Sequence, residues 1–279
     1  MNFEMAAEML NFAHATVLTS DDCAVINGTY TTGRSGVTGT VIVEKCVGSL
    51  AETGASLPAY KAIGDKVNAR SASIGVALTS CTVPAAGRPS FELDDNDIEM
   101  GVGIHGEPWR RREPLREADA IIKYMVDAIV ADFSHRNISI KTDALLLVNG
   151  FGATPLMEFY LIYNTATTLL KAHGVNIARS VVGNYVTALD MAGASITLCV
   201  MDAEIKEHWD SAVHTPALRW YRWVYLIASF QLFMLFKKYF LNLNFFSINL
   251  HIYFNSIYSL NYTNHILNNT YYCDLLTID

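Results

Sequence analysis

The 279-residue sequence lacks the patterns typical of a metal site, a secreted protein or a nucleic-acid-binding protein. Its five cysteines are widely spaced and include no Cys-x-x-Cys pair; they are Cys23, Cys46, Cys81, Cys199 and Cys273. Such scattered thiols are typical of reduced cysteines in a cytoplasmic protein. The formal net charge of −7 argues against a nucleic-acid partner, because phosphate binding requires a basic surface. The first residues also lack the basic and apolar regions of a secretory signal peptide.

A nucleotide-binding loop is missing as well. Residues 31–40 are rich in glycine, but they lack the Gly-Lys-Ser/Thr ending of a P-loop and the GxGxxG spacing of a dinucleotide site. We interpret them as a tight loop that packs the start of a helix, with a phosphate-binding turn as the alternative.

Short apolar runs alternate with amphipathic stretches along the first 220 residues. The predicted strands are 15–18, 74–78, 91–93, 99–104, 143–148, 175–179 and 195–201, and the predicted helices are 4–10, 41–57, 58–68, 116–130 and 154–171. Thr154 is the predicted N-cap of the last helix, followed by Pro155 in its first turn, and Gly174 fits the position after its end. This alternation predicts mixed α/β layers with a largely buried sheet.

The composition changes after Trp220. Residues 221–279 contain no glycine, proline or glutamate, and are crowded with Phe, Tyr, Ile, Leu and Asn. The uncharged run at residues 223–236 has 14 residues, whereas a membrane-spanning helix requires about 20. Because the favoured residues are those of AT-rich codons, translated non-coding sequence is our first interpretation. A membrane-associated tail and an ordered extension are the alternatives.

One histidine has an unusual setting, in the stretch Met-Gly-Val-Gly-Ile-His-Gly-Glu-Pro at residues 100–108. Glycines on both sides of His105 permit unusual backbone angles and allow a ligand to approach the backbone closely. Pro108 then fixes the direction in which the chain leaves. A histidine presented in this way can act near neutral pH as a nucleophile, a proton carrier or a metal ligand. An ordinary surface turn is the alternative.

Five further motifs accompany this stretch: residues 79–87 (Thr-Ser-Cys-Thr-Val-Pro-Ala-Ala-Gly), 149–156 (Asn-Gly-Phe-Gly-Ala-Thr-Pro-Leu), 183–187 (Gly-Asn-Tyr-Val-Thr), 189–193 (Leu-Asp-Met-Ala-Gly) and 214–220 (His-Thr-Pro-Ala-Leu-Arg-Trp). In this order they resemble the substrate-binding subunit of dihydroxyacetone kinases, from residue 1 to about Trp220. We interpret Asp190 as a fold-stabilising acid and His214 as part of a structural turn.

The resemblance implies two mixed α/β domains whose buried sheets are covered by helices, the first domain being incomplete. Residues 1–72 would be the remnant of the first domain, and residues 73–220 the second domain, which carries His105. Residues 221–279 would lie outside the family. The family's proton-accepting aspartate and a glycine-rich histidine segment would precede Met1. We therefore expect a chain that binds a ketose and does not phosphorylate it alone.

The resemblance also assigns the chemistry. In the family, the histidine of the Gly-Ile-His-Gly-Glu-Pro motif holds dihydroxyacetone as a reversible covalent hemiaminal, and this role passes to His105. Covalent capture suits so small a substrate, because noncovalent affinity is limited to about 1.5 kcal/mol per heavy atom. Glu107 is a candidate for orienting the imidazole, although its side chain could equally point away. The family normally has glycine where this chain has Trp109, at a cost of about 1–2 kcal/mol if that position requires φ > 0.

Partners follow from the same resemblance. We expect no cofactor on this chain, with ATP and magnesium held by a helical nucleotide-binding domain or subunit, and the family forms homodimers. The resemblance does not decide whether ATP or a phosphorelay protein donates the phosphoryl group. It also leaves open whether this chain acts as an enzyme. A noncatalytic ketose sensor that acts on a protein partner and a degenerate gene product are the alternative functions.

We expect residues 221–279 to be dispensable for the α/β unit, because no turn or cap residues join the tail to it. A chain that ends at Trp220 should be more soluble than the full chain and melt at no lower temperature. Thermal unfolding of both chains tests this, and a large fall in melting temperature after truncation would show that the tail packs.

Overall fold

The computed structural model describes residues 2–24, 34–103 and 111–220. Residues Met1–Ser211 form one compact unit, and a second unit begins at Ala212. The first unit contains a six-stranded mixed sheet in the order β5-β4-β1-β8-β6-β7. Its strands are β1 (Ser71–Ala77), β4 (Asp97–Met100), β5 (Arg111–Pro114), β6 (Asp143–Gly150), β7 (Asn176–Gly183) and β8 (Gly193–Val200). Only the β6–β7 pair of this sheet is parallel.

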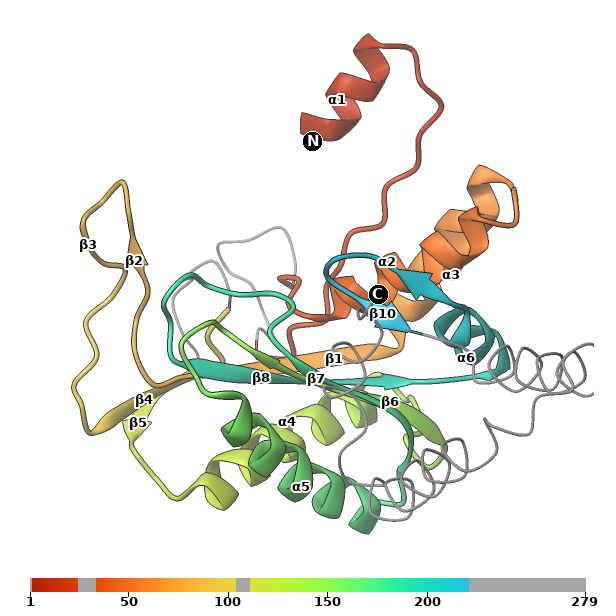
Figure 1. Ribbon diagram of the computed structural model, residues 1–279. Helices are drawn as coiled ribbons and strands as arrows, with labels where there is room; N and C mark the ends of the chain where they lie inside the picture. Colours follow the sequence, from red (N-terminus) through yellow and green to blue (C-terminus); the bar gives the residue numbers. More distant parts are fainter. Residues whose placement is uncertain (1, 25–33, 104–110, 221–279) are drawn as a thin grey trace, which may run out of the picture. The chain divides into compact units, whose positions relative to one another are not determined.

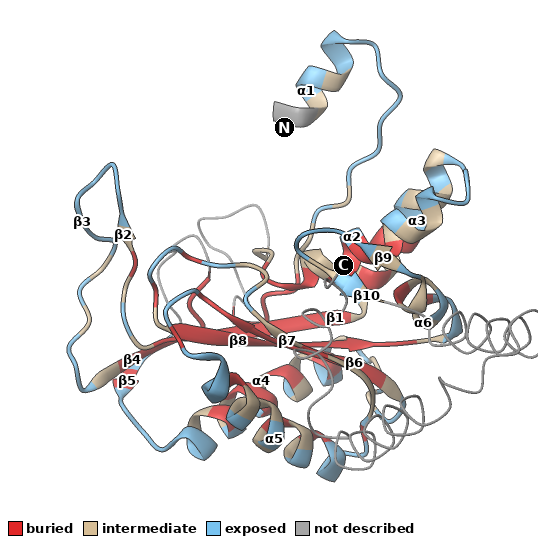
Figure 2. Cartoon of the chain, viewed as in Figure 1, coloured by how far each residue is buried: buried red, intermediate tan, exposed pale blue. Residues whose placement is uncertain are grey.

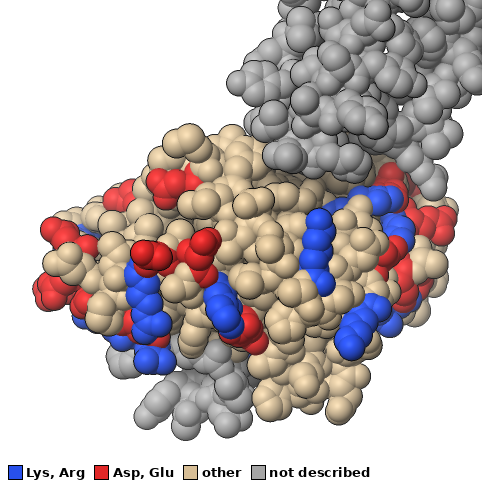
Figure 3. All heavy atoms as spheres, turned by 90° about the horizontal axis from the view of Figure 1, so that it is seen from below, with Lys and Arg blue, Asp and Glu red and all other residues tan. Residues whose placement is uncertain are grey.

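Helices cover both faces of the sheet, as the predicted α/β fold class requires (Figure 1). On one face lie α4 (Ala118–His135) and α5 (Leu156–Ala172), and on the other α2 (Gly39–Ala51), α3 (Leu57–Ala69) and α6 (Ala203–Asp210). The central strands β1, β6 and β8 are buried on both faces along most of their length, whereas the edge strands β5 and β7 are more exposed (Figure 2). Figure 3 shows the chain from the side of α4 and α5, where acidic and basic side chains are interspersed on the described surface.

The face toward α4 and α5 is apolar. Because side chains alternate along a strand, Ala72, Ile74 and Val76 of β1 point to this face. The apolar stripe predicted for residues 116–130 packs against them; its buried members are Ile122, Met125, Val126 and Ile129. Burial of such side chains contributes about 25 cal/mol per Å² of apolar surface removed from water. This layer is the main hydrophobic core of the unit.

The opposite face, which we call the polar face, carries buried polar side chains among apolar ones such as Leu145 and Leu147. Ser71 and Ser73 of β1, Ser195 and Thr197 of β8, and Asn149 of β6 are each at most 1% exposed. Buried hydroxyl and amide groups must be hydrogen-bonded, so these five side chains require specific partners. Two thiols also lie buried here, and burial raises the pKa of Cys46 to about 12 and that of Cys199 to about 11. Both are therefore protonated at neutral pH, and both are free thiols.

Lys45 fastens α2 to the end of α6. Its ammonium group donates to the carbonyl oxygens of His208, at 3.1 Å, and Ser211, at 2.8 Å, and to the Ser211 hydroxyl at 2.7 Å. The last carbonyl groups of a helix have no partner within the helix and attract cations. The ammonium group of Lys45 loses contact with water when it forms these bonds, and this burial lowers its pKa.

Two predicted strands are absent from the described residues, and the N-cap predicted for the helix at residues 154–171 is wrong. Residues 15–18 are in no ladder, because α3 side chains take up their carbonyl groups: Lys61 donates to Thr16 and Asn68 to Leu18. Residues 91–93 are also outside the sheet, and β5, which was not predicted, pairs with β4 instead. Thr154 does not cap α5.

The Thr154 hydroxyl bonds the backbone of Gly193 at the start of β8, and α5 begins after Pro155. The prediction for Gly174 is confirmed, since it follows α5 with φ +83°. The division at residue 72 stays a prediction; that position lies inside β1, and Met1–Ser211 form one unit. The tail, residues 221–279, lies outside the described residues.

The remaining described elements are short. They are α1 (Asn2–Met9), the β2 (Thr82–Val83) and β3 (Arg88–Pro89) hairpin, and the β9 (Val213–His214) and β10 (Arg219–Trp220) hairpin of the second unit. The Thr215 hydroxyl closes the β9–β10 turn by accepting from the Leu218 N–H, and His214 lies in β9 just before this turn. Within the described ranges, the helices are all too short or too polar to span a bilayer.

Replacing Lys45 with methionine would keep the apolar stem and remove the donor from the end of α6. We expect a loss of about 1–2 kcal/mol in the free energy of unfolding, or about 3–6 °C in melting temperature. Lys123→Met is the matched control, because Lys123 is 61% exposed and forms an i,i+4 pair with Asp127; such pairs contribute about 0.3–0.5 kcal/mol. Equal melting temperatures for Lys45→Met and the wild type would show that Lys45 does not stabilise the end of α6.

Candidate functional site

The residues predicted to carry the chemistry lie outside the described part of the structure. His105, Glu107 and Trp109 all belong to residues 104–110. Their roles therefore stay predictions. Among the described residues, no cluster of three or more histidine, cysteine or acidic side chains is arranged to hold a metal ion.

The two flanks of this segment are fixed by strand pairing. Met100 at the end of β4 lies opposite Arg111 at the start of β5. One step further along the ladder, Glu99 is 1% exposed and its Oε2 accepts from Arg112 Nε at 3.1 Å. Glu99, before the histidine segment, thus pairs with Arg112, after it. The segment that carries His105 connects two neighbouring antiparallel strands.

Gly75 of β1 makes room for the chain that enters this segment. Gly101 adopts φ +76°, and its N–H donates to the Gly75 carbonyl at 2.7 Å. A Cβ atom on Gly75 would lie 2.5 Å from the Val102 carbonyl oxygen, so a larger residue would displace the chain. Val102 is buried in a small cluster with Ala77, Cys81, Phe151, Ala188 and Met191. The entry to the histidine segment is therefore anchored to the sheet.

Four of the other motifs that carry the family resemblance meet at the same end of the sheet: residues 79–87, 149–156, 183–187 and 189–193. Asn149, near the end of β6, lies opposite Gly183 at the end of β7. Ala77, at the end of β1, lies opposite Gly193 at the start of β8. The carboxyl ends of β1, β6 and β7 are thus together. Ligands of open α/β sheets usually bind at this edge.

Asn149 holds the loop that follows β7. Its Oδ1 accepts from the backbone N–H groups of Tyr185, at 2.8 Å, and Val186, at 2.9 Å. Its Nδ2 donates to the Val186 carbonyl at 2.8 Å and to the Ser195 hydroxyl at 3.3 Å. Asn149 is fully buried, so these bonds form away from water and are costly to break. The side chain of Tyr185 is partly buried, and this burial raises its pKa.

A strained turn precedes β8. Leu189 adopts φ +56°, a conformation that costs a non-glycine residue about 1–2 kcal/mol. Gly152, at φ +132°, accommodates this turn, because a Cβ there would lie 2.1 Å from the Leu189 carbonyl oxygen. Asp190 Oδ1 accepts from the Thr82 N–H at 2.7 Å, and this bond lowers the pKa of Asp190. The contact supports the interpretation of Asp190 as a fold-stabilising acid.

Asp21 joins the start of α2 to the polar face of the sheet. It has no exposed surface, and its carboxylate accepts from the N–H groups of Val37 and Gly39, each at 2.8 Å, and from the Ser73 hydroxyl. The positive end of the helix dipole stabilises a carboxylate in this position. These N–H groups are therefore occupied by the chain. That supports the interpretation of the glycine-rich loop as the packed start of a helix.

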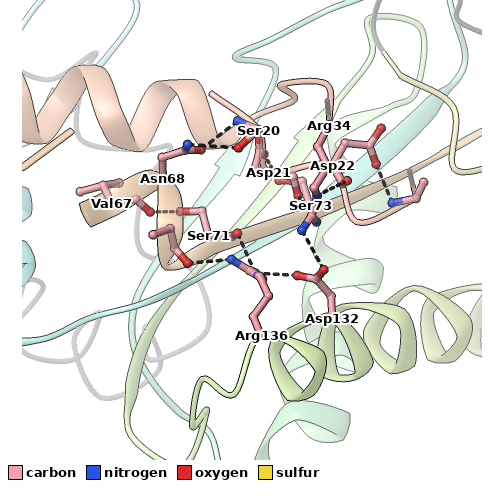
Figure 4. Close-up of polar contacts among 12 residues, drawn as sticks. Ser20, Asp21, Asp22, Arg34, Val67, Asn68, Ser71, Ser73, Asp132 and Arg136 are labelled. Carbon is pink, nitrogen blue, oxygen red and sulfur yellow. Dashed lines mark hydrogen bonds and ion pairs between the residues drawn. The ribbon is translucent and has the colours of Figure 1, made fainter. Parts of the chain in front are cut away.

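An ion-pair cluster holds the same region to α4 (Figure 4). Arg34 donates from Nη1 to Asp132 at 2.8 Å and from Nε to the Asp22 carbonyl at 2.9 Å. Arg136 donates to Asp132 at 2.5 Å and to the Ser71 carbonyl at 3.0 Å. Asp132 is only 15% exposed, so water screens the cluster weakly. Residues on both sides of the stretch 25–33 are thus fixed beside β1.

Sequence reasoning missed the organising roles of Asp21 and Asn149. Asn149 carried a detectable signal, a polar residue at the end of an apolar strand. Asp21 did not, because its partners lie 16 to 52 residues away in the sequence. Both side chains use their hydrogen-bonding capacity on the chain itself, so they provide rigidity rather than reacting groups.

Comparisons with known proteins agree with these motifs. The model of the Dak1 domain matches residues 1–217. The dihydroxyacetone-binding subunit DhaK of the PEP-dependent dihydroxyacetone kinase of Escherichia coli (strain K12) is 44% identical over 244 residues, which cover 79% of this chain and 68% of that protein. The corresponding subunit of the PTS-dependent dihydroxyacetone kinase 1 of Listeria innocua is 45% identical, with 73% and 62% covered. The chain thus spans about two thirds of the length of these relatives.

Two solved structures also resemble the chain. The dihydroxyacetone kinase operon co-activator Dha-DhaQ superimposes with a TM-score of 0.69 at 28% identity, over 76% of this chain and 65% of that one. The dihydroxyacetone kinase of C. freundii in complex with AMP-PNP and Mg2+ gives a TM-score of 0.63 at 25% identity, over 79% and 40%.

Replacing Asn149 with alanine would leave the backbone groups of Tyr185 and Val186 without their partner. We expect a loss of about 2–3 kcal/mol in stability, together with faster hydrogen exchange at these two amides. Asn164→Ala, at an exposed position of α5, is the control. Unchanged exchange at both amides in Asn149→Ala would show that the loop is held by other contacts.

Proposed function

The chain belongs to the Dak1 domain family, and we propose that it is the dihydroxyacetone-binding part of a dihydroxyacetone kinase. The observation that carries the proposal is the 44% identity to the E. coli dihydroxyacetone-binding subunit. The structure supports it by bringing the motifs at residues 79–87, 149–156, 183–187 and 189–193 to one end of the sheet and by anchoring there the entry to the histidine segment.

We assign substrate capture to His105. The lone pair of a neutral imidazole nitrogen forms a bond to the ketone carbon, and the carbonyl π electrons move to the oxygen. The proton lost from the other ring nitrogen balances the proton gained by that oxygen, which gives a neutral hemiaminal. Glycerol has no carbonyl group and would be rejected. A carboxylate that fixes the imidazole tautomer would favour the addition, and Glu107 is our candidate for it.

Phosphoryl transfer from this site requires a partner. We assign ATP and magnesium to a nucleotide-binding domain or subunit, because the transfer depends on in-line positioning and on metal ions that neutralise the moving phosphate. The C. freundii kinase, of which the matched part is 40%, was solved with AMP-PNP and Mg2+. We further propose a homodimer in the cytoplasm. No bound cofactor is assigned to this chain.

A ketose sensor is the second candidate. The likeness to the operon co-activator, at a TM-score of 0.69, favours it. The same hemiaminal could change the contacts of the chain with a regulatory protein, without any transfer of phosphate. The two functions differ in one respect that can be measured, since only the kinase produces dihydroxyacetone phosphate with a nucleotide-binding partner.

We expect the wild-type chain to gain the mass of one dihydroxyacetone molecule in native mass spectrometry. His105→Ala should lose this adduct because it lacks the attacking nitrogen, whereas His135→Ala, at an exposed position of α4, should keep it. An adduct of equal yield in His105→Ala would refute the assignment. Formation of dihydroxyacetone phosphate after addition of the nucleotide-binding subunit of the E. coli kinase and a phosphoryl donor would identify the chain as part of a kinase rather than a sensor.

A further inference from the structure

β5, the strand that follows the histidine segment, is held to the sheet without apolar packing of its own. All four of its residues are described, and the one buried side chain among them is that of Glu113. Glu113 forms ion pairs with Arg111 in the same strand and with Arg116 just after it. Across the ladder, Arg112 pairs with Glu99 of β4 at 3.1 Å. This ion pair therefore links the strand after the histidine segment to the strand before it.

We propose that Glu99 and Arg112 are positioning residues for ketose capture, because their ion pair fixes the register in which the histidine segment leaves β4 and returns to β5. The inference rests on the proposed function, which assigns that capture to His105. Side chains alternate between the two faces of a strand, so a slip of β5 by one residue would move Arg112 to the other face and break the pair. The pair thus selects one register of a ladder whose strands have four residues each.

The burial of Glu99 is not explained by stability. Its side chain is 1% exposed, its Oε2 accepts from Arg112 Nε, and its Oε1 is buried with no hydrogen-bond partner among the described residues. A buried carboxylate oxygen without a donor destabilises the folded chain. Well-packed apolar side chains in place of a buried ion pair are often equally stable or more so, and the best-attested use of such a pair is to fix a register.

Arg112 also connects the exit of the histidine segment to the surroundings of its entry. Its Nη2 donates to the Glu92 carbonyl at 2.7 Å. The neighbouring Phe91 packs against the buried cluster that contains Val102, in the chain that enters the segment. The guanidinium group suits this role, because its planar fork donates in fixed directions. The two ends of the segment are thus held relative to one part of the sheet.

Covalent capture is sensitive to positioning of this kind. The attacking nitrogen must reach the ketone carbon at about 3–3.5 Å along a defined direction, and a misplacement of about 1 Å can slow a reaction by about 100-fold. The adduct is also less favourable where the segment must distort to reach the ketose. Loss of the Glu99–Arg112 pair should therefore reduce capture by chains that are still folded.

The test uses the full chain and dihydroxyacetone labelled with carbon-13 at the ketone carbon, whose NMR signal moves when that carbon becomes tetrahedral in the adduct. Glu99→Gln keeps the size of the side chain and removes its charge. We expect the adduct per folded chain to fall by about tenfold or more, measured well below the melting temperature of each variant.

A second variant and a control accompany Glu99→Gln. The double variant Glu99→Gln/Arg112→Gln should lose no more adduct than Glu99→Gln alone, because both changes remove the same contact. Glu204→Gln is the matched control: Glu204 is 53% exposed and pairs with Lys66, in a helix that follows β8 at the other end of the sheet. Its adduct should equal that of the wild type.

A merely structural role would lower the folded fraction of Glu99→Gln while each folded chain captured the ketose like the wild type, and this result would overturn the inference. A double variant that captures far less than Glu99→Gln would overturn it too, since the two side chains would then act separately. Capture by the wild type and equally by Glu99→Gln overturns the positioning role alone. A wild type that forms no adduct overturns the proposed function and this role with it.

Discussion

The structure depends on one constraint: the polar side chains on the α2 side of the sheet are buried and must therefore be hydrogen-bonded. Asp21 meets this requirement between α2 and β1, and Ser73 continues the network to Thr197 on β8 at 2.6 Å. Thr38 bonds Ser195 at 3.0 Å, so the helix start and the sheet share a second connection. Each of these groups would cost about 1–3 kcal/mol if it were left buried without a partner.

The same constraint positions the loops at the end of the sheet. Asn149 lies on the polar face of β6, and its hydrogen bonds to the backbone fix the loop after β7 relative to that strand. Gly75 and Gly152 act in a different way, by leaving space where two backbones approach closely. The turn at Leu189 and the entry at Val102 follow from these two glycines. Rigid strands and specific contacts thus hold the motifs that the chain shares with the Dak1 domain family.

Predictions from the sequence succeeded where one segment carries its own signal. The stripe of α4, the buried run of β6 and Gly174 after α5 were all identified correctly, because periodicity and turn chemistry are local properties. They failed where a distant partner decided the outcome. Thr154 has the chemistry of an N-cap, yet its hydroxyl bonds Gly193, which lies 39 residues away.

The sequence by itself determined the fold class, most helices and central strands, and the family, since these follow from patterns read along the chain. It also singled out His105 as the residue that carries the proposed chemistry. Only the tertiary structure decided that Asp21 caps α2, that Asn149 fixes the loop after β7, and that the strained Leu189 displays an apolar side chain. The physical reason is that a hydrogen bond or a close backbone approach depends on where two segments meet, and no local pattern encodes that meeting.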